Sequence, residues 1–293
     1  MFNNILNYTI QENDKTVKSI LTENLKFSGR LSKKLERNGK IYLNGKTVKL
    51  NKSIFTGDQL SIEFDEEEDQ YAAVDIPIDI IYEDDDLLVV NKPPYIVVHP
   101  TRSHQDDTIA NGLAYYFKKN NINRKVRFVN RLDMNTSGIV IIAKNPYVHN
   151  QLGKQLKSNS VEKFYYAIVE GLMTEKKGRI KAPIARLNPE DIVRVVHPSG
   201  KECITEFIAE KKFNNMTLVK LKLITGRTHQ IRVHLKHIGH PIVGDTLYGN
   251  KSIFIDRQAL HCYKMKLNHP ITNKELIIKC PVPADMKRII ADE

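Results

Sequence analysis

The stretch that decides the fold reads Asn130-Arg131-Leu132-Asp133-Met134-Asn135-Thr136-Ser137-Gly138. An apolar run over residues 139–143 follows at once and predicts a buried strand. Asp133 then lies in a corner between this strand and a predicted strand over residues 127–129. An aspartate before Thr-Ser-Gly is most often a turn former that hydrogen-bonds its own backbone. A corner held by rigid strands also suits a nucleophile, so both readings stand at this point.

A second informative stretch, residues 225–234, reads Thr-Gly-Arg-Thr-His-Gln-Ile-Arg-Val-His. It predicts an amphipathic helix over residues 228–238 with Thr228 as its N-cap. His229 and Arg232 share one face of this helix, near an N-terminus whose dipole favours anions. A merely solvated charged face is the ordinary alternative. His229 and His234 are five residues apart and no third ligand is evident, so we expect no metal.

A third stretch, residues 162–171, reads Glu-Lys-Phe-Tyr-Tyr-Ala-Ile-Val-Glu-Gly and predicts a strand over 164–169. The neighbours Tyr165 and Tyr166 must face opposite sides of a sheet. The tyrosine on a pocket side is able to stack on a base, whereas a core tyrosine with a satisfied hydroxyl is the ordinary alternative.

Composition points to a polyanionic partner. The 293 residues carry a formal net charge of +11, and three scattered cysteines form no ligand cluster. Such cysteines favour reduced thiols in a cytosol. We see no signal peptide and no apolar run of transmembrane length, so we expect a cytoplasmic protein without membrane contact.

Charge also divides the chain. Residues 1–60 hold 11 Lys/Arg and 5 Asp/Glu, whereas residues 61–86 hold 12 Asp/Glu and no Lys/Arg. We therefore predict a small basic domain over residues 1–65, an acidic linker over 66–75 and a large domain over 76–293. The acidic run is read as a solubilising linker rather than as a surface that repels nucleic acid.

The basic domain is predicted to be α+β. Helical spacing runs over residues 17–25, a second helix follows Ser28-Gly29, and Asn44-Gly45 joins two short β-prone runs as a hairpin does. One face of the second helix carries the cations Arg30, Lys33, Lys34 and Arg37. These four cations could bind a phosphate backbone, or they could form an ordinary solvated helix face.

The large domain is predicted to be α+β with a mixed, largely antiparallel sheet, because its strands outnumber its helices and are mostly joined by short turns. Strands are expected over residues 78–82, 87–91, 127–129, 139–143, 164–169 and 217–223. Helices are expected over residues 108–118, 149–157 and 228–238.

Taken together, residues 82–100, 130–145, 162–171 and 225–249 resemble the RluA-type pseudouridine synthases. The resemblance covers about residues 75–290. It departs at Asn130, where the family usually has His. The order helix, helix, hairpin, strand in residues 1–65 resembles the S4 RNA-binding domain, in a shortened copy.

The resemblance implies the pseudouridine synthase fold and an isomerase of uridine in structured RNA. It assigns Asp133 as the nucleophile, Arg232 as its ion-pair partner with Arg227 as the runner-up, and Tyr165 as the aromatic against the flipped base. It further assigns Arg131 as the side chain that fills the gap in the RNA stack, and Tyr166 is then expected in the core. Rearranging one glycosidic bond needs no redox agent, metal or nucleotide, so we expect no cofactor.

Several alternatives remain open from sequence. RNA is the expected partner, and the S4-like part favours large-subunit ribosomal RNA, with Arg227, His229 and the basic helix among the contacts. A transfer-RNA-directed synthase and a catalytically silent RNA-binding protein are the alternatives, and a phosphate-handling hydrolase lacks its Gly-rich loop. A monomer is expected, and whether attack begins on ribose or base stays undecided.

Overall fold

The computed structural model describes residues 5–65, 70–188 and 190–291. Four residues of the predicted acidic linker, 66–69, lie outside the described residues. Among the described residues, every helix is too short or too polar to cross a bilayer.

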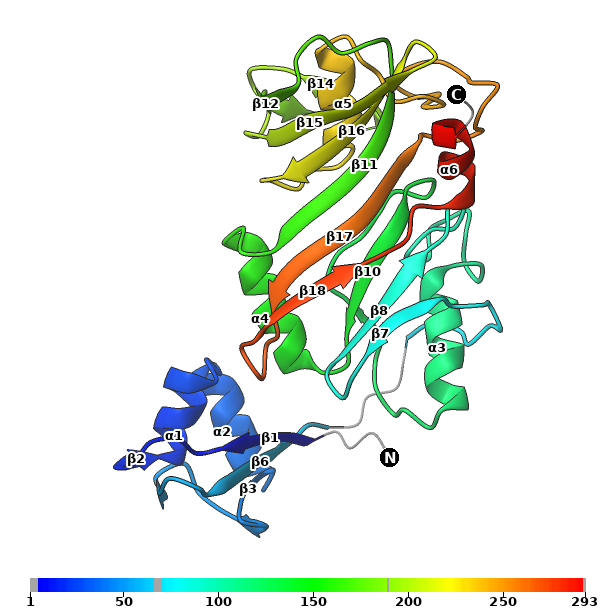
Figure 1. The fold of residues 1–293 in the computed structure, drawn as a ribbon. Helices are drawn as coiled ribbons and strands as arrows, with labels where there is room; N and C mark the ends of the chain where they lie inside the picture. The colour runs from blue at the N-terminus through cyan, green and yellow to red at the C-terminus, as the bar shows by residue number, and fades with distance from the viewer. Residues whose placement is uncertain (1–4, 66–69, 189, 292–293) are drawn as a thin grey trace.

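A ten-stranded sheet forms the body of the molecule (Figure 1). Its strands run in the order β12-β15-β16-β11-β17-β10-β8-β7, with β18 paired to β17 and β9 paired to β10. Every pairing in it is antiparallel except the short parallel pairing of β10 with β17. The predicted α+β fold with a mixed, largely antiparallel sheet is thereby confirmed. The strands are β7 (Ile80–Glu83), β8 (Leu87–Lys92), β9 (Arg127–Phe128), β10 (Ser137–Ala143), β11 (Glu162–Glu170), β12 (Lys177–Lys181), β15 (Ile204–Phe213), β16 (Met216–Leu223), β17 (Leu260–Asn268) and β18 (Glu275–Lys279).

Four helices and a small hairpin pack around this sheet. The hairpin pairs β13 (Ile184–Ala185) with β14 (Val195–Val196). The helices are α3 (Ile109–Lys119), α4 (Pro146–Lys157), α5 (Gln230–His237) and α6 (Ala284–Ala291). Local sequence starts two of them: Thr108 and Asn111 form a capping box for α3, and Asn145 caps α4 with Pro146 in its first turn.

Residues 5–65, hereafter the N-terminal block, build separate sheets of their own. The order β1-β6-β3-β4 forms a four-stranded sheet, and β2 pairs with β5. Asn44 and Gly45 both take positive φ between β3 and β4, which confirms the predicted hairpin. The elements are β1 (Ile5–Thr9), β2 (Lys15–Thr16), α1 (Val17–Ser19), the π-helical turn η1 (Ile20–Asn24), α2 (Gly29–Arg37), β3 (Ile41–Leu43), β4 (Lys46–Thr47), β5 (Ser53–Ile54) and β6 (Gln59–Glu63).

The N-terminal block packs on helix α4. The rings of Phe27 and Tyr147 stack with centroids 4.5 Å apart. Gln151 of α4 donates to the carbonyl of Leu25 at 3.0 Å. In Figure 1 the block lies at one end of the molecule and α5 at the other. The division into domains at residues 65 and 75 stays a prediction.

The parallel contact between β10 and β17 sets where the Asp133 turn enters the sheet. Ser137 and Gly138 pair with His261 and Cys262. Gly138 has φ +117°, and a Cβ atom there would lie 2.3 Å from the carbonyl oxygen of Cys262. Only glycine fits this crossing, because it lacks Cβ and tolerates positive φ.

We expect Gly138→Ala to lower the free energy of unfolding by about 1–3 kcal/mol from backbone strain alone, with the overlap adding to that loss. Chemical denaturation followed by circular dichroism measures the change. Gly153→Ala in helix α4 is the matched control, because nothing lies within 4 Å of its added Cβ. The control should gain about 0.5–1 kcal/mol, and equal stabilities of the two variants would contradict the packing argument.

Candidate active site

Asp133 lies in the turn that leads into β10. The turn is closed by the amide of Thr136, which donates to the carbonyl of Asp133 at 3.0 Å. The Asp133 side chain is 30% exposed, so its carboxylate faces a cavity rather than bulk solvent. The predicted corner between β9 and β10 is confirmed.

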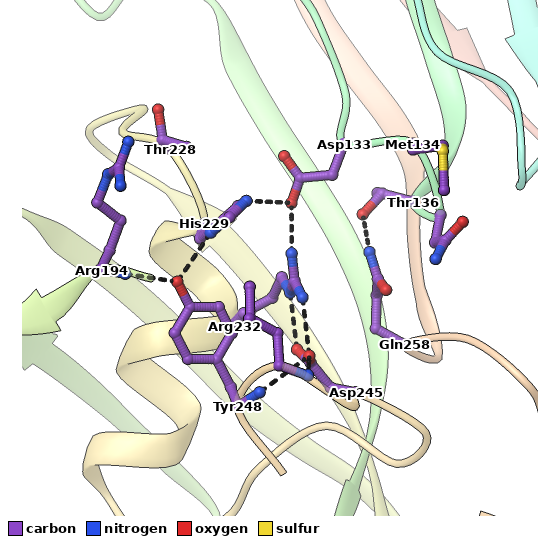
Figure 2. A network of polar contacts seen from close by, with 12 residues as sticks. Asp133, Met134, Thr136, Arg194, Thr228, His229, Arg232, Asp245, Tyr248 and Gln258 are labelled. Carbon is purple, nitrogen blue, oxygen red and sulfur yellow. Dashed lines mark hydrogen bonds and ion pairs between the residues drawn. The ribbon is translucent and has the colours of Figure 1, made fainter. Parts of the chain in front are cut away.

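Arg232 on helix α5 joins Asp133 to a second carboxylate (Figure 2). Its Nη1 atom donates to Asp133 Oδ2 at 3.2 Å. Its Nε and Nη2 atoms donate to the two carboxylate oxygens of Asp245 at 2.7 and 2.8 Å, and Asp245 is fully buried. Burial opposes the guanidinium charge, but the hydrogen bonds and charges of Asp245 and Asp133 raise the pKa of Arg232 above its ordinary value. Of the two predicted partners, Arg232 is the one that reaches Asp133, whereas Arg227 is exposed at the rim.

His229 lies on the other side of the Asp133 carboxylate, with Nε2 3.8 Å from Oδ2. Its Nδ1 is 2.8 Å from the hydroxyl of Tyr248, and that hydroxyl accepts the amide proton of Arg194 at 2.8 Å. The hydroxyl of Tyr248 therefore donates its own proton to Nδ1. In the neutral imidazole the ring proton is then on Nε2, which faces Asp133. Burial lowers the pKa of His229 and favours this neutral form.

The predicted N-cap of α5 at Thr228 is wrong. Helix α5 begins at Gln230, preceded by His229 in the left-handed conformation with φ 58°. The side chain of Gln230 turns back and accepts from the amide of Arg227 at 3.0 Å. His229 itself makes no side-chain cap, and its ring lies against Tyr248 and Asp133.

Tyr165 forms a wall of the same cavity. It lies on β11, is 6% exposed, and burial raises the pKa of its hydroxyl well above the ordinary value. Tyr166 does not lie in the core as expected. It is half-buried on the opposite face of the sheet and stacks on Tyr263 at 4.1 Å, because that face is only partly covered.

Sequence reasoning missed Lys163. It lies two residues before Tyr165 on β11 and shares its face, so the alternation of the strand was the available signal. Lys163 is 9% exposed and lines the cavity, and burial lowers its pKa. Among the described residues its ammonium group has no hydrogen-bond or ion-pair partner, which leaves this group available to a ligand.

The Asp133 cavity, defined by Asp133, Lys163, Tyr165 and the rim residues Arg131 and Arg227, has a volume of about 570 Å³. This lies within the usual range for small-molecule and cofactor pockets. Arg131 is exposed at the entrance and donates to Thr228 at 3.5 Å.

The side chain of Asn130, at the position where the family usually has His, forms hydrogen bonds with the backbone. Its side chain donates to the carbonyl of Ile139 at 3.1 Å and accepts from the amide of Ile141 at 2.8 Å. The amide therefore fixes the corner beside the nucleophile candidate.

Buried side chains hold the backbone that carries Asp133. The fully buried Lys92 donates to the carbonyl of Met134 at 2.7 Å and to two further carbonyls. Burial lowers the pKa of Lys92 to about 7, but three carbonyl acceptors match the three protons of the charged form. Arg257 donates to the carbonyl of Asn135 at 3.1 Å and pairs with Asp285 of α6.

The four cations predicted to bind RNA, Arg30, Lys33, Lys34 and Arg37, are all exposed on α2. Lys34 pairs with Asp65 at 3.1 Å. Helix α2 lies in the N-terminal block, far from α5 in Figure 1, so the structure does not bring these cations to Asp133.

No metal is expected at Asp133. His234 is buried and bonds Thr205 and the carbonyl of Ala182, so it is not free to join His229 as a ligand. In the described part of the chain, the one cluster with suitable spacing is Asp84, Asp86 and His269. His269 already bonds Asp84 at 3.1 Å, which gives this cluster a structural explanation.

Comparison with known proteins shows the family of this chain. Residues 86–237 match the family described as RNA pseudouridylate synthase. The chain is 39% identical over 279 residues to the uncharacterized RNA pseudouridine synthase YjbO of Bacillus subtilis, which covers 94% of this chain and 95% of that protein. It is 37% identical over 267 residues to the ribosomal large subunit pseudouridine synthase D of Escherichia coli O6:H1, with 86% and 82% covered.

A solved structure shares the fold. Human RNA pseudouridylate synthase domain containing 1 superposes with a TM-score of 0.59 at 28% identity, covering 70% of this chain and 83% of that chain. The chain therefore belongs to the RNA pseudouridylate synthase family and is of the RluA type. It is an enzyme that isomerises uridine in RNA.

We expect Asp245→Asn to destabilise the protein by about 3–5 kcal/mol, because it leaves the buried Arg232 without its main counter-charge. Denaturant unfolding gives the stability, and pseudouridine formation under conditions where the variant stays folded should also fall. Glu210→Gln is the control, since it breaks the exposed pair with Lys220 at 2.8 Å. Exposed pairs contribute about 0–1 kcal/mol, so equal losses in the two variants would contradict the argument.

Proposed function

We propose that Asp133 is the nucleophile with which this enzyme converts uridine to pseudouridine. The observation that carries the proposal is the carboxylate held 3.2 Å from Arg232 in a cavity walled by Tyr165. In the proposed reaction the carboxylate attacks the nucleoside, the bond between N1 and C1′ breaks, and the base turns so that C5 bonds C1′. The bond between the carboxylate and the nucleoside breaks in turn, which frees Asp133. The proton on C5 is then lost and N1 gains one, so the reaction is an isomerisation.

The uridine must leave its stack before Asp133 can reach it, at a cost of a few kcal/mol. Arg131 at the cavity entrance is placed to fill the gap left in the RNA. Tyr165 then packs against the base, and Arg232 keeps its charge beside the attacking carboxylate. His229 faces the same oxygen with its Nε2, at 3.8 Å, which is beyond hydrogen-bond distance, so Arg232 remains the hydrogen-bond donor from α5.

We propose large-subunit ribosomal RNA as the substrate. Relatives that match most of this chain are named ribosomal large subunit pseudouridine synthase D, including those of Escherichia coli and Haemophilus ducreyi. Transfer RNA is the alternative that mapping of the product would reveal. A ribosomal target would place the enzyme in the cytoplasm. We also propose a monomer, because one chain supplies every group of the proposed site.

We further propose that residues 1–65, which include the N-terminal block, form an S4-like RNA-binding domain. The cations of α2 support this, because they are exposed on one surface helix. Its docking on α4 supports a shared RNA-binding surface, since the end of α4 supplies Leu156 and Lys157 to the Asp133 cavity.

Asp133→Asn should reduce pseudouridine formation by roughly a thousandfold or more, because removing a nucleophile removes the reaction path. The measurement is mapping of pseudouridine in large-subunit ribosomal RNA incubated with each variant. Binding of the same RNA is the control and should change little. Substantial turnover by the Asn variant would mean that another group attacks.

Replacing Arg30, Lys33 and Arg37 with Gln should weaken RNA binding and flatten its salt dependence, because fewer counterions are released. If each cation neutralises one phosphate, the slope of log affinity against log salt should fall by about two to three units. The control replaces Lys118, Lys119 and Lys287, which are exposed elsewhere, with Gln. Equal slopes in the two triple variants would show that α2 does not bind the RNA backbone.

A further inference from the structure

A second cavity adjoins the Asp133 cavity across the loop before α5. This Arg186 cavity has a volume of about 470 Å³ and is lined by residues 184–186, 194, 199–201 and 226–228. Residues 226–228 also line the Asp133 cavity. They therefore form a ridge with one cavity on each side.

The Arg186 cavity is strongly basic. Its lining includes Arg186, Arg194, Lys201 and Arg227 and no carboxylate. In the ranges that the structure describes, none of these four cations has a recorded ion pair. Two cations of β12 that do not line this cavity are paired instead: Lys181 lies 3.0 Å from Glu202, and Arg179 lies 3.8 Å from Glu206. Unpaired charge concentrated in one concave site raises the local concentration of anions.

Two of the arginines also shape the cavity wall. Arg194 donates to the carbonyls of Asp191, Ile192 and Val193, and Arg186 donates from Nε to the carbonyl of Asp191 at 2.7 Å. Within the ranges that the structure describes, the terminal nitrogens of Arg186 have no hydrogen-bond partner. Arg186 is thus oriented by its Nε while its outer guanidinium edge stays available for a bidentate contact.

A chain of contacts links this wall to the catalytic carboxylate (Figure 2). The amide of Arg194 donates to Tyr248, Tyr248 contacts His229, and His229 faces Asp133. The loop that lines the Arg186 cavity is therefore fixed relative to the reacting group.

We propose that the Arg186 cavity binds the phosphodiester of a nucleotide that flanks the target uridine, so that the RNA strand crosses the ridge of residues 226–228. The inference rests on the proposed function, because the uridine is assigned to the Asp133 cavity. Arg186 and Lys201 hold the phosphate, Arg227 contacts the strand at the ridge, and Arg194 fixes the wall. The flanking phosphate is then anchored while the uridine turns out of its stack.

The test is the double variant Arg186→Gln/Lys201→Gln in the full chain. The probe is a synthetic RNA hairpin around a uridine that the enzyme converts in ribosomal RNA. We expect about a tenfold or greater loss of affinity and a salt slope smaller by one to two units, because two phosphate contacts are lost. The single-turnover rate at saturating RNA should stay within about threefold, because the contact is made before and during the reaction alike. The control, Arg179→Gln/Lys181→Gln, makes the same charge change on paired cations and should leave affinity nearly unchanged.

A neutral methylphosphonate placed at each linkage near the uridine locates the contact. One linkage next to the uridine should weaken binding to the unmodified enzyme and have little further effect on the double variant. An unchanged salt slope in the double variant, or additive effects at every linkage, would overturn the proposal. The proposed nucleophile and the proposed phosphate site are tested independently. Turnover by Asp133→Asn would contradict the assignment of Asp133 as the nucleophile, whereas the binding results do not depend on which group attacks.

Discussion

The site depends on one buried guanidinium that is shared between two carboxylates. Arg232 uses Nε and Nη2 on Asp245, so Nη1 is the donor that remains for Asp133. The planar geometry of the bidentate pair therefore fixes the direction from which Asp133 is approached. Asp245 is itself held by the amides of Leu247 and Tyr248, at 3.1 and 3.2 Å. A buried ion pair contributes little net stability by itself, but it defines position, and position is what this reaction needs.

The rest of the fold brings that guanidinium to the nucleophile candidate. Asp133 and Arg232 are 99 residues apart and lie on a turn and a helix that pack together through the sheet. The turn is held on its far side by Lys92 and Arg257, which bind successive carbonyls. Its backbone cannot relax toward Arg232 without breaking these bonds, so the distance is set from both sides. Rigid supports of this kind are what keep a reacting group within a fraction of an ångström of its productive place.

Much of this architecture was predictable because it follows local patterns. Three predicted features depend on residues close in sequence: the apolar run after Ser137-Gly138, the Asn44-Gly45 hairpin and the amphipathic pattern of α5. The pairing of Asp133 with Arg232 came from the resemblance of the motifs and not from spacing. Asp245 was missed as the partner of Arg232, because nothing near it in sequence indicates that it would be buried against a helix. The N-cap at Thr228 was wrong because Gln230 closes the turn with a side-chain bond that composition does not reveal.

Lys163 shows how a strand pattern becomes informative once its faces are known. Its alternation with Tyr165 was visible, but which face lined a cavity was not. With the face known, Lys163 and the cations of the Arg186 cavity lie on both sides of the same ridge. In the proposed complex these cations give the RNA strand a phosphate contact on each side of the uridine, and such contacts contribute to binding before and after the base leaves its stack. Tyr165 lines the Asp133 cavity and not the Arg186 cavity, so the aromatic wall and the basic wall lie in separate cavities that share residues 226–228.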